Sequence, residues 1–347
     1  MNAIETKNLT KVYKDFTAVN SLNLEIPDNT IFGMLGPNGA GKTTTIKMLT
    51  CLIQPTSGEA TVGGYDIKKD PDEVRKLLGM VPQQVSLYKD LTVMENSQLC
   101  ADYYGIKPNE RDSRIEDLME LVDIKYAKDK LISQLSGGQK QKASLVASLV
   151  HRPKILFLDE PTIGLDPTTK RTLWDLIREL NDNGHTIILC SHDMHEVDML
   201  CDNVGIINTG NLVAYDTPQG LKDTLLESNK KEISDTLSQI SAESEVNSST
   251  KEDVANLSLR KMSFLLKSND DNIINSLKQN SHIESIEIAH NGRINLRIDY
   301  FDDDAVNSVL DSVINSNGVI KSITTEEPSL EDVFIKATSE VNEDDRV

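Results

Sequence analysis

The feature that most constrains the fold is the stretch GPNGAGKTT at residues 36–44. An apolar run, TIFGML, precedes it, and a helical pattern, TTTIKMLTCL, begins within it. Its glycines let the backbone wrap phosphate groups without Cβ clashes, while backbone amides and a helix N-terminus supply positive potential. The pattern therefore predicts a phosphate-binding loop in which Lys42 reaches the β- and γ-phosphates and Thr43 ligates Mg²⁺. An ordinary glycine-rich turn is disfavoured by the strand before it and the helix after it.

Two carboxylates end a second apolar run, KILFLDEP, at residues 154–161. Placing carboxylates without partners at the end of a buried strand is costly, and such strand ends carry function in α/β proteins. Asp159 is suited to hold the magnesium shell, and Glu160 is suited to orient and polarise an attacking water. The alternative, a solvated acidic loop, is disfavoured because four apolar residues run directly into the pair.

The chain falls into three zones. Residues 1–225 alternate short apolar runs with amphipathic helical stretches, which predicts an α/β domain with a largely parallel sheet. Residues 226–256 are rich in Ser, Glu, Lys and Asn and contain no aromatic residue, which predicts a polar linker. Residues 257–347 follow the order β-α-β-β-α-β, typical of a ferredoxin-like α+β domain, and end in a short helix. We expect this last domain to be accessory or regulatory.

The apolar side chains of the last helix, in SLEDVFIKATSE, are spaced as on an amphipathic helix. Leu330, Val333 and Phe334 fall on one helical face, so this helix is predicted to pack against an apolar surface.

Composition excludes several classes of protein. The net charge of −19 argues against a general nucleic-acid binder, which usually has a basic face. Residues 226–347 carry 12 basic and 24 acidic side chains, so −12 of that charge lies in the last third. The four cysteines are scattered without a C-x-x-C pair, which favours free thiols. No apolar run approaches the roughly 18–20 residues of a membrane span, so work at a membrane would require a second, spanning chain.

A second glycine-rich motif, LSGGQ at residues 135–139, lies between the phosphate loop and the paired carboxylates. A given five-residue string arises by chance on the order of once per million positions. With this motif, residues 1 to about 225 resemble the ATP-binding cassette (ABC) family. The resemblance implies a P-loop ATPase domain with a RecA-like core, a helical subdomain and an antiparallel β subdomain. It also implies ATP and Mg²⁺ as cofactors, and a homodimer or heterodimer.

In that family the LSGGQ signature binds the γ-phosphate of ATP that is held by the opposite protomer. The resemblance therefore implies that Ser136, Gly137 and Gly138 contact a partner's nucleotide, with Gln139 as the last member of the signature. The phosphate loop of the same chain would comprise Gly36, Pro37, Asn38, Gly39, Ala40, Gly41, Lys42, Thr43 and Thr44.

The remaining family motifs follow in order. Tyr13, in KVYKDFTAV, matches the aromatic residue that stacks on adenine. Gln83, in GMVPQQ, matches the glutamine that contacts magnesium and senses the γ-phosphate, with Gln84 as its rival. Asp166, in GLDP, would face the other protomer, and His192, in SHDMHE, would contact the γ-phosphate.

These assignments give a catalytic set of Glu160, His192 and Lys42, and magnesium ligands Thr43, Gln83 and Asp159. Metal binding by His192 and His195 is a competing interpretation, since imidazole is a common ligand.

Two stretches resemble the drug-exporter branch of the family, of the daunorubicin-resistance and multidrug type. They are CDNVGIINTGNLVAYDTPQGLK at 201–222 and EEPSLEDVFIKAT at 326–338. The branch implies a separate ABC-2-type permease as partner, no nucleic acid, and a peripheral position on the cytoplasmic face of the membrane. The alternative is a soluble, non-transport ABC ATPase that acts on ribosomes or DNA. Such proteins usually carry two cassettes or a long coiled-coil insertion, which this chain lacks.

A further alternative is a binding or regulatory module with weak turnover. The intact pair of Asp159 and Glu160 argues against it.

Overall fold

The structure is a computed structural model that describes residues 2–228, 231, 259–267, 271–289, 292–299, 304–325 and 328–344. The chain divides into two compact units: Met1–Leu221 with Leu330–Val347, and Lys222–Ser329. Of the predicted polar linker, residues 226–228 continue a helix that begins at residue 218, residue 231 is also helical, and the rest lies outside the described residues. The two units are described separately below.

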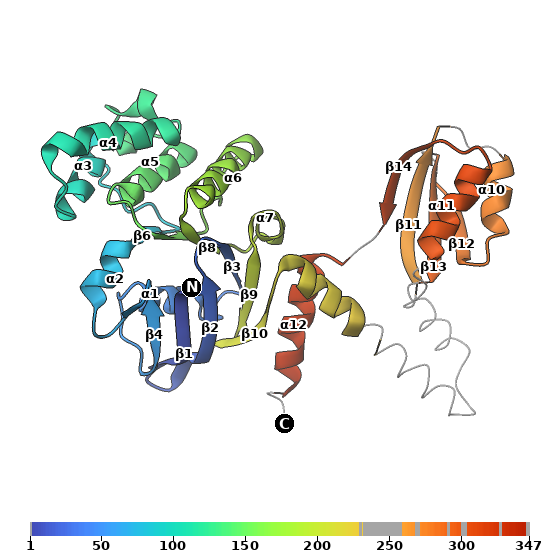
Figure 1. Cartoon of the computed structure of the whole chain (residues 1–347), viewed down its shortest axis with the longest axis horizontal. Coiled ribbons are helices and arrows are strands. Elements are labelled where there is room, and N and C mark those ends of the chain that lie inside the picture. The colour runs from blue at the N-terminus through green and yellow to red at the C-terminus, as the bar shows by residue number, and fades with distance from the viewer. Residues whose placement is uncertain are drawn as a thin grey trace. The chain divides into compact units, whose positions relative to one another are not determined.

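A six-stranded sheet forms the centre of the first unit (Figure 1). Five of its strands are parallel, and β10 joins one edge antiparallel to β9. In sheet order the strands are β10 (Asn211–Asp216), β9 (Asn203–Asn208), β3 (Ile31–Leu35), β8 (Thr186–Cys190), β7 (Ile155–Asp159) and β6 (Leu78–Val81). The central strands read IFGML, TIILC and ILFLD and are almost entirely buried, as expected of parallel strands covered on both faces. Their carboxyl ends meet at one edge of the sheet, where α/β proteins bind ligands.

Three helices follow central strands and begin at that edge. They are α1 (Lys42–Leu49) after β3, α6 (Pro167–Asp182) after β7, and α7 (Met194–Leu200) after β8. Helix α2 (Pro71–Leu77) leads into β6.

An antiparallel sheet and a group of helices complete the predicted ABC ATPase architecture. The sheet consists of β2 (Phe16–Pro27), β1 (Asn2–Tyr13), β4 (Ser57–Val62) and β5 (Tyr65–Asp66), and it shares one apolar core with β3, β7 and α1. The helices α3 (Val93–Tyr103), α4 (Pro108–Leu121) and α5 (Gly137–Leu149) pack against one another (Figure 1). Two short 3₁₀ helices, η1 (Lys125–Ala127) and η2 (Ile132–Gln134), connect α4 to α5.

The second unit has the predicted element order β-α-β-β-α-β. Its elements are β11 (Leu259–Leu266), α10 (Asp271–Lys278), β12 (Ile283–Ile288), β13 (Arg293–Asp299), α11 (Ala305–Asn315) and β14 (Ile320–Thr325). The antiparallel sheet has the order β12-β13-β11-β14, and α10 packs against α11. Alternate residues of β11 and β13 are buried against these helices, including Met262, Phe264, Leu296 and Ile298. The period-2 pattern of these strands therefore places one face in the core.

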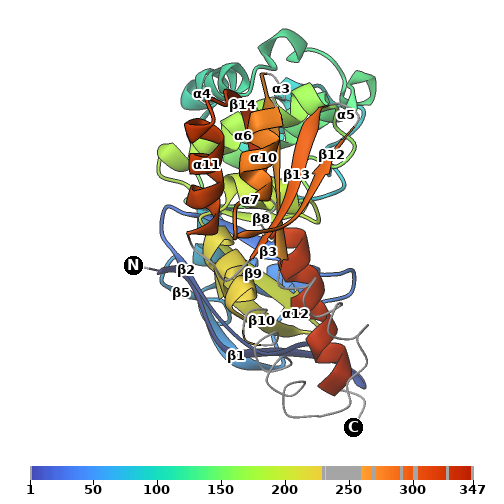
Figure 2. The same ribbon diagram turned by 90° about the vertical axis from the view of Figure 1, so that its right-hand side faces the viewer.

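The last helix, α12 (Leu330–Asp344), belongs to the first unit rather than to the second. It contacts α7, β9 and β10, and it runs beside β10 in both views (Figures 1 and 2). Leu330 and Val333 are buried, so the predicted packing of this apolar face is confirmed. The structure thus departs from the predicted 257–347 domain, because α12 groups with the first unit, where Leu330 and Val333 are buried.

None of the helices in the described part of the chain combines the length and hydropathy that a membrane span requires.

Candidate functional site

The loop between β3 and α1 has the geometry of a phosphate cradle. Gly41 is the N-cap of α1 with φ 107°, in the left-handed region that favours glycine. A Cβ atom at Gly41 would lie 2.4 Å from the carbonyl oxygen of Ala18, and one at Gly36 would lie 2.3 Å from that of Ile207. The Nζ atom of Lys42 donates to the carbonyl oxygens of Gly36 and Pro37, so the amine already lies over the loop. Glycine is therefore required where the backbone passes closest to its neighbours.

The two carboxylates lie at the carboxyl end of β7. Asp159 pairs with Cys190 of β8, and burial raises its pKa above the ordinary value. The charge of Glu160 adds to this rise in pKa, while Lys42 opposes it. Glu160 has φ 54°, a left-handed conformation that is rare for a non-glycine residue, and its amide donates to the carbonyl of Cys190 at 2.8 Å. Strand β8 thus fixes the position of this strained residue.

His192, in the loop between β8 and α7, is hydrogen-bonded to Glu160. The distance between Nδ1 of His192 and Oε2 of Glu160 is 2.7 Å. The imidazole remains largely exposed, with 65 % of the side chain accessible, so Nε2 is free to meet a ligand. A histidine so placed can contact transferred phosphate while its other nitrogen is held by a carboxylate.

A buried network holds the loop that carries His192. Glu196 of α7 is fully buried and accepts hydrogen bonds from Ser191 Oγ at 2.6 Å and Trp174 Nε1 at 2.8 Å. Lys170 of α6 forms an ion pair with Asp193, the residue that follows His192. This network escaped the sequence analysis, because nothing in the spacing shows that α6 and α7 share polar contacts.

Two cavities that share lining residues surround these groups. The first, of about 270 Å³, is lined by the loop from Pro37 to Thr44 and by Gln83, Asp159, Glu160, Phe16 and Ala18. The second, of about 400 Å³, is lined by Leu35, Gly36, Pro37, Asn38, Gln83, Glu160, Ile163, His192, Met194 and Phe334. The structure therefore brings the phosphate loop, both carboxylates, Gln83 and His192 together. Gln84, the rival of Gln83, lines neither cavity.

Tyr13, the predicted adenine contact, lies outside the two cavities that the phosphate loop lines. Tyr13 is 45 % exposed and lines neither cavity, whereas Phe16 lines the first one. The two aromatic residues face each other across the β1–β2 hairpin. The sequence analysis did not single out Phe16. Its position three residues after Tyr13, in the same hairpin, could have indicated a second aromatic candidate for the adenine contact.

The signature residues lie apart from both cavities. Ser136 caps α5, and its backbone amide donates to Gln139 Oε1 at 2.9 Å in a capping box. A Cβ atom added at Gly137 would meet only open space, whereas one at Gly138 would lie 2.8 Å from Thr169 Cγ2, so the helix start is open on the Gly137 side. A helix N-terminus carries positive potential. None of Ser136–Gln139 lines either of the two cavities.

Asp166 acts as the N-cap of α6. Its carboxylate accepts from the amides of Thr168 and Thr169 and from the Thr169 hydroxyl, and these bonds hold its pKa below the ordinary value. The structure thus gives Asp166 a role within its own chain, beside the one predicted across a dimer.

The donors around the carboxylates suit Mg²⁺. Thr43, Gln83 and Asp159 all offer oxygen, the donor that magnesium prefers alongside substrate phosphates. The half-buried Asp159, whose pKa is raised beside Glu160, is an electrostatic site that a cation would stabilise.

The competing histidine site is not supported. Within the described residues no group of three His, Cys, Asp or Glu side chains converges on one point. His195 instead packs edge-on against Trp174.

The fold and this site define a P-loop nucleotide-binding protein, and comparison with known proteins gives its family. Residues 19–163 match the family model described as ABC transporter. Residues 252–338 match the ATP-binding protein DrrA1-3-like, C-terminal domain.

Curated relatives agree with these matches. The chain is 39 % identical over 219 residues to the linearmycin resistance ATP-binding protein LnrL of Bacillus subtilis, covering 63 % of this chain and 70 % of LnrL. It is 39 % identical over 223 residues to the daunorubicin/doxorubicin resistance ATP-binding protein DrrA of Streptomyces peucetius, covering 64 % and 68 %.

Solved structures share the fold. An ATP-binding subunit of an ABC transporter superposes with a TM-score of 0.60 at 27 % identity, covering 64 % of this chain and 93 % of that chain. A dimeric, post-hydrolysis ATP-binding cassette bound to ADP and Pi gives 0.57 at 28 % identity, covering 62 % and 98 %. The chain therefore belongs to the ATP-binding proteins of the ABC transporter family, and it is an ATPase that binds ATP.

Proposed function

We propose that this ATPase powers the export of drugs or other amphipathic compounds through a separate ABC-2-type permease. Two observations support export: the relatives LnrL and DrrA are both named for resistance to such compounds, and the tail matches a DrrA-like domain. The chain would act as a peripheral subunit on the cytoplasmic face of the membrane.

The chemistry follows from the two cavities. Lys42 would turn from the loop carbonyls toward the β- and γ-phosphates of ATP. Thr43, Gln83 and Asp159 would hold Mg²⁺, which when bound neutralises phosphate charge. Glu160 would orient and polarise a water for in-line attack on the γ-phosphorus.

His192 would complete the ATP site from the loop between β8 and α7. Its Nδ1 stays hydrogen-bonded to Glu160 while Nε2 contacts the γ-phosphate. In this arrangement the imidazole neutralises charge that grows on the transferred group.

We propose that two copies act together. Ser136, Gly137 and Gly138 are separated from the nucleotide cavities of their own chain, although they form a helix N-terminus suited to an anion. The similar cassette that holds ADP and Pi is a dimer. A second copy would bring this signature to the γ-phosphate, so each site would combine two chains.

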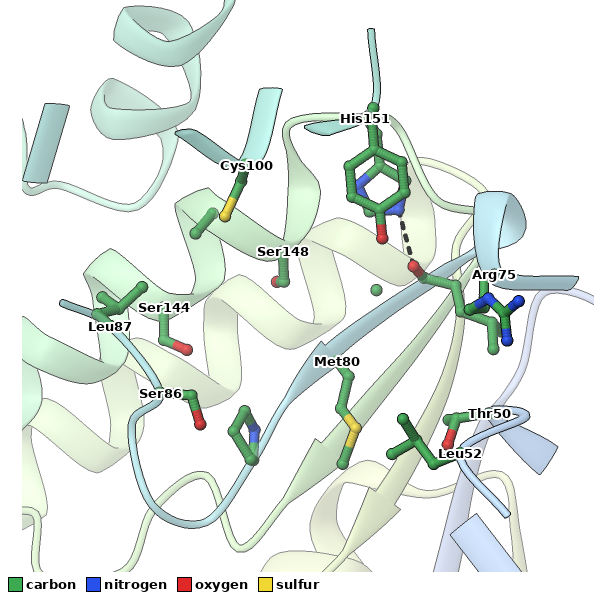
Figure 3. A pocket seen from close by; sticks show the side chains of 15 residues that line it. Thr50, Leu52, Arg75, Met80, Ser86, Leu87, Cys100, Ser144, Ser148 and His151 are labelled. Atoms are coloured by element: carbon green, nitrogen blue, oxygen red, sulfur yellow. Dashed lines mark hydrogen bonds between the residues drawn. The ribbon is translucent and has the colours of Figure 1, made fainter. Parts of the chain in front are cut away.

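A groove beside the loop that carries Gln83 is a candidate docking site for the permease. It encloses about 290 Å³ between α5 and the segment that carries Thr50 and Leu52, with Met80 at its floor (Figure 3). Leu52 is 62 % exposed at its rim. The groove includes Ser86 and Leu87, while Gln83 of the same loop lines the nucleotide cavities. A permease segment seated here would therefore be linked to the γ-phosphate by one short loop.

The observation that carries the proposal is the position of Glu160, strained and hydrogen-bonded to His192 beside the phosphate loop. Glu160→Gln keeps the shape of the side chain and removes its charge. We expect ATP binding to persist while phosphate release falls by about 10²-fold or more, the contribution of a general base. An ATP-bound dimer should then accumulate in size-exclusion chromatography.

The matched control is Glu179→Gln on the exposed face of α6, which should retain the wild-type rate. A wild-type rate of phosphate release in Glu160→Gln would overturn the assignment of Glu160 as the catalytic carboxylate.

A further inference from the structure

Helix α12 reaches the nucleotide site from the far end of the sequence. Its residues follow the second unit in the chain, yet they group with the first unit. Leu330 is 2 % exposed and Val333 is 6 % exposed, so both side chains anchor the helix. One turn further along, Asn208 Nδ2 of β9 donates to the carbonyl oxygen of Thr338 at 3.2 Å. The helix is thus fixed at its start by burial and near its middle by a hydrogen bond.

Phe334 lies between these anchors and lines the second cavity. The other walls of that cavity include Asn38 of the phosphate loop, Gln83, Glu160 and His192. Among the residues that line it, Phe334 is the one supplied by the tail of the chain. An aromatic ring therefore faces the same space as the hydrogen-bonded pair of Glu160 and His192.

The ring can act on that pair in two physical ways. His192 is 65 % exposed in its side chain, so few contacts restrict its imidazole apart from the bond to Glu160. Phe334 lines the same cavity as His192, so its ring takes up space that the imidazole could otherwise enter when the site is filled. Phe334 is also an apolar member of the lining, with Ile163 and Met194, and apolar surface that displaces water strengthens electrostatic interactions.

We infer that Phe334 is a positioning residue for ATP hydrolysis, through which α12 holds the pair of Glu160 and His192 in its productive arrangement. The inference rests on the proposed catalytic roles of those two residues. It assigns α12 to the ATPase site of its own chain, and it separates this helix in function from residues 222–329.

The test compares steady-state ATP hydrolysis by full-length variants. Phe334→Ala should lower kcat by about tenfold, a modest part of what small misplacements of catalytic groups cost. Its KM for ATP should stay within about twofold, since Phe334 does not line the cavity that contains Lys42 and Thr43. Phe334→Leu, which restores much of the volume, should recover most of kcat.

The matched control is Ile335→Ala. Ile335 is the next residue of α12 and is 58 % exposed, so its removal should leave kcat unchanged. If Phe334→Ala matches Ile335→Ala in kcat, the positioning role is wrong. It is also wrong if Phe334→Leu fails to recover activity while melting at the wild-type temperature.

Glu160→Gln, measured in the same assay, separates the two levels of the proposal. Slow hydrolysis by Glu160→Gln with a wild-type rate for Phe334→Ala overturns only the role of Phe334. A wild-type rate for Glu160→Gln overturns the proposed chemistry itself.

Discussion

Glu160 is one of ten described non-glycine residues with positive φ, and among them it is the one that lies at the proposed catalytic position and is hydrogen-bonded to His192. A non-glycine residue in the left-handed region costs of the order of 1–3 kcal/mol and persists only where its surroundings over-determine it. Here the amide bond to Cys190 and the side-chain bond to His192 do so. In this conformation the Glu160 carboxylate lies within hydrogen-bond distance of His192.

The aromatic contact to adenine is a second residue-level question, and it gives a prediction. Tyr13 is 45 % exposed, but Lys11 Nζ lies over one face of its ring, 5.1 Å from the ring centre, so adenine would have to displace this amine or stack on the opposite face. Tyr13→Ala should weaken ATP binding by roughly fivefold or more, since base stacking contributes about 1–3 kcal/mol. Its affinity for pyrophosphate, which has no base, should not change. Isothermal titration calorimetry measures both.

Phe16→Ala is the matched comparison, because Phe16 faces Tyr13 across the hairpin and lines the phosphate cavity. A selective loss of ATP affinity in Phe16→Ala, with none in Tyr13→Ala, would move the adenine contact to Phe16.

At the scale of elements, α6 and α7 are joined through Trp174 and Glu196. Trp174 of α6 donates to Glu196 of α7, and Lys170 lies 5.2 Å from the Trp174 ring centre while pairing with Asp193. Because α6 begins at the cap Asp166 and α7 follows His192, we expect a shift of one loop to be transmitted to the other.

Glu196→Gln tests this link. The new amide group can accept only at one atom, so one of the two donors, Ser191 Oγ or Trp174 Nε1, loses its acceptor. A buried donor without a partner costs about 1–3 kcal/mol, so the melting temperature should fall by several degrees. Since Trp174 is the single tryptophan of the chain, its fluorescence should change on ATP binding in the wild type and change less in the variant.

Glu179→Gln again serves as the control, because it makes the same chemical change at an exposed position of α6. Identical melting temperatures and identical fluorescence responses in Glu196→Gln and the control would contradict the coupling.

At the scale of the whole molecule, the separation of the signature from the phosphate loop predicts complementation between copies. Lys42→Ala damages a site's own phosphate grip, whereas Ser136→Arg damages the partner's site. In a heterodimer of the two variants, one composite site carries both lesions and the other carries none. Mixing two inactive proteins should therefore restore part of the ATPase activity, measured as phosphate release.

A heterodimer of wild type with the double variant is the control, since each of its sites then carries one lesion. It should stay inactive. If the mixed single variants form heterodimers and this control is the more active of the two, the composite arrangement is wrong.

The sequence was sufficient for features that depend on local pattern. The buried runs IFGML, ILFLD and TIILC predicted the parallel strands, and the glycine spacing of residues 36–41 predicted the cradle. These predictions succeed because a buried strand appears in the sequence as a run of apolar residues, and a left-handed turn appears as a glycine. The predicted ABC ATPase fold class is confirmed by the solved structures that share it.

Features that depend on tertiary partners could not be predicted. The apolar face of α12 shows that it packs against something, but its spacing does not name α7, β9 and β10 as the partners. For the same reason the sequence could not predict the hydrogen bond between Trp174 and Glu196, which helps to hold the loop of His192. The two residues lie 22 positions apart, and no local pattern links them.

The return of α12 to the first unit has a consequence for biosynthesis. Residues 222–329 must be translated before α12 exists, which takes on the order of ten seconds at roughly 5–20 residues per second. Until then the surface that Leu330 and Val333 cover is open to solvent. Before α12 leaves the ribosome, this uncovered strip is open to chaperones and to aggregation, and Phe334 cannot yet line the cavity that Glu160 also lines.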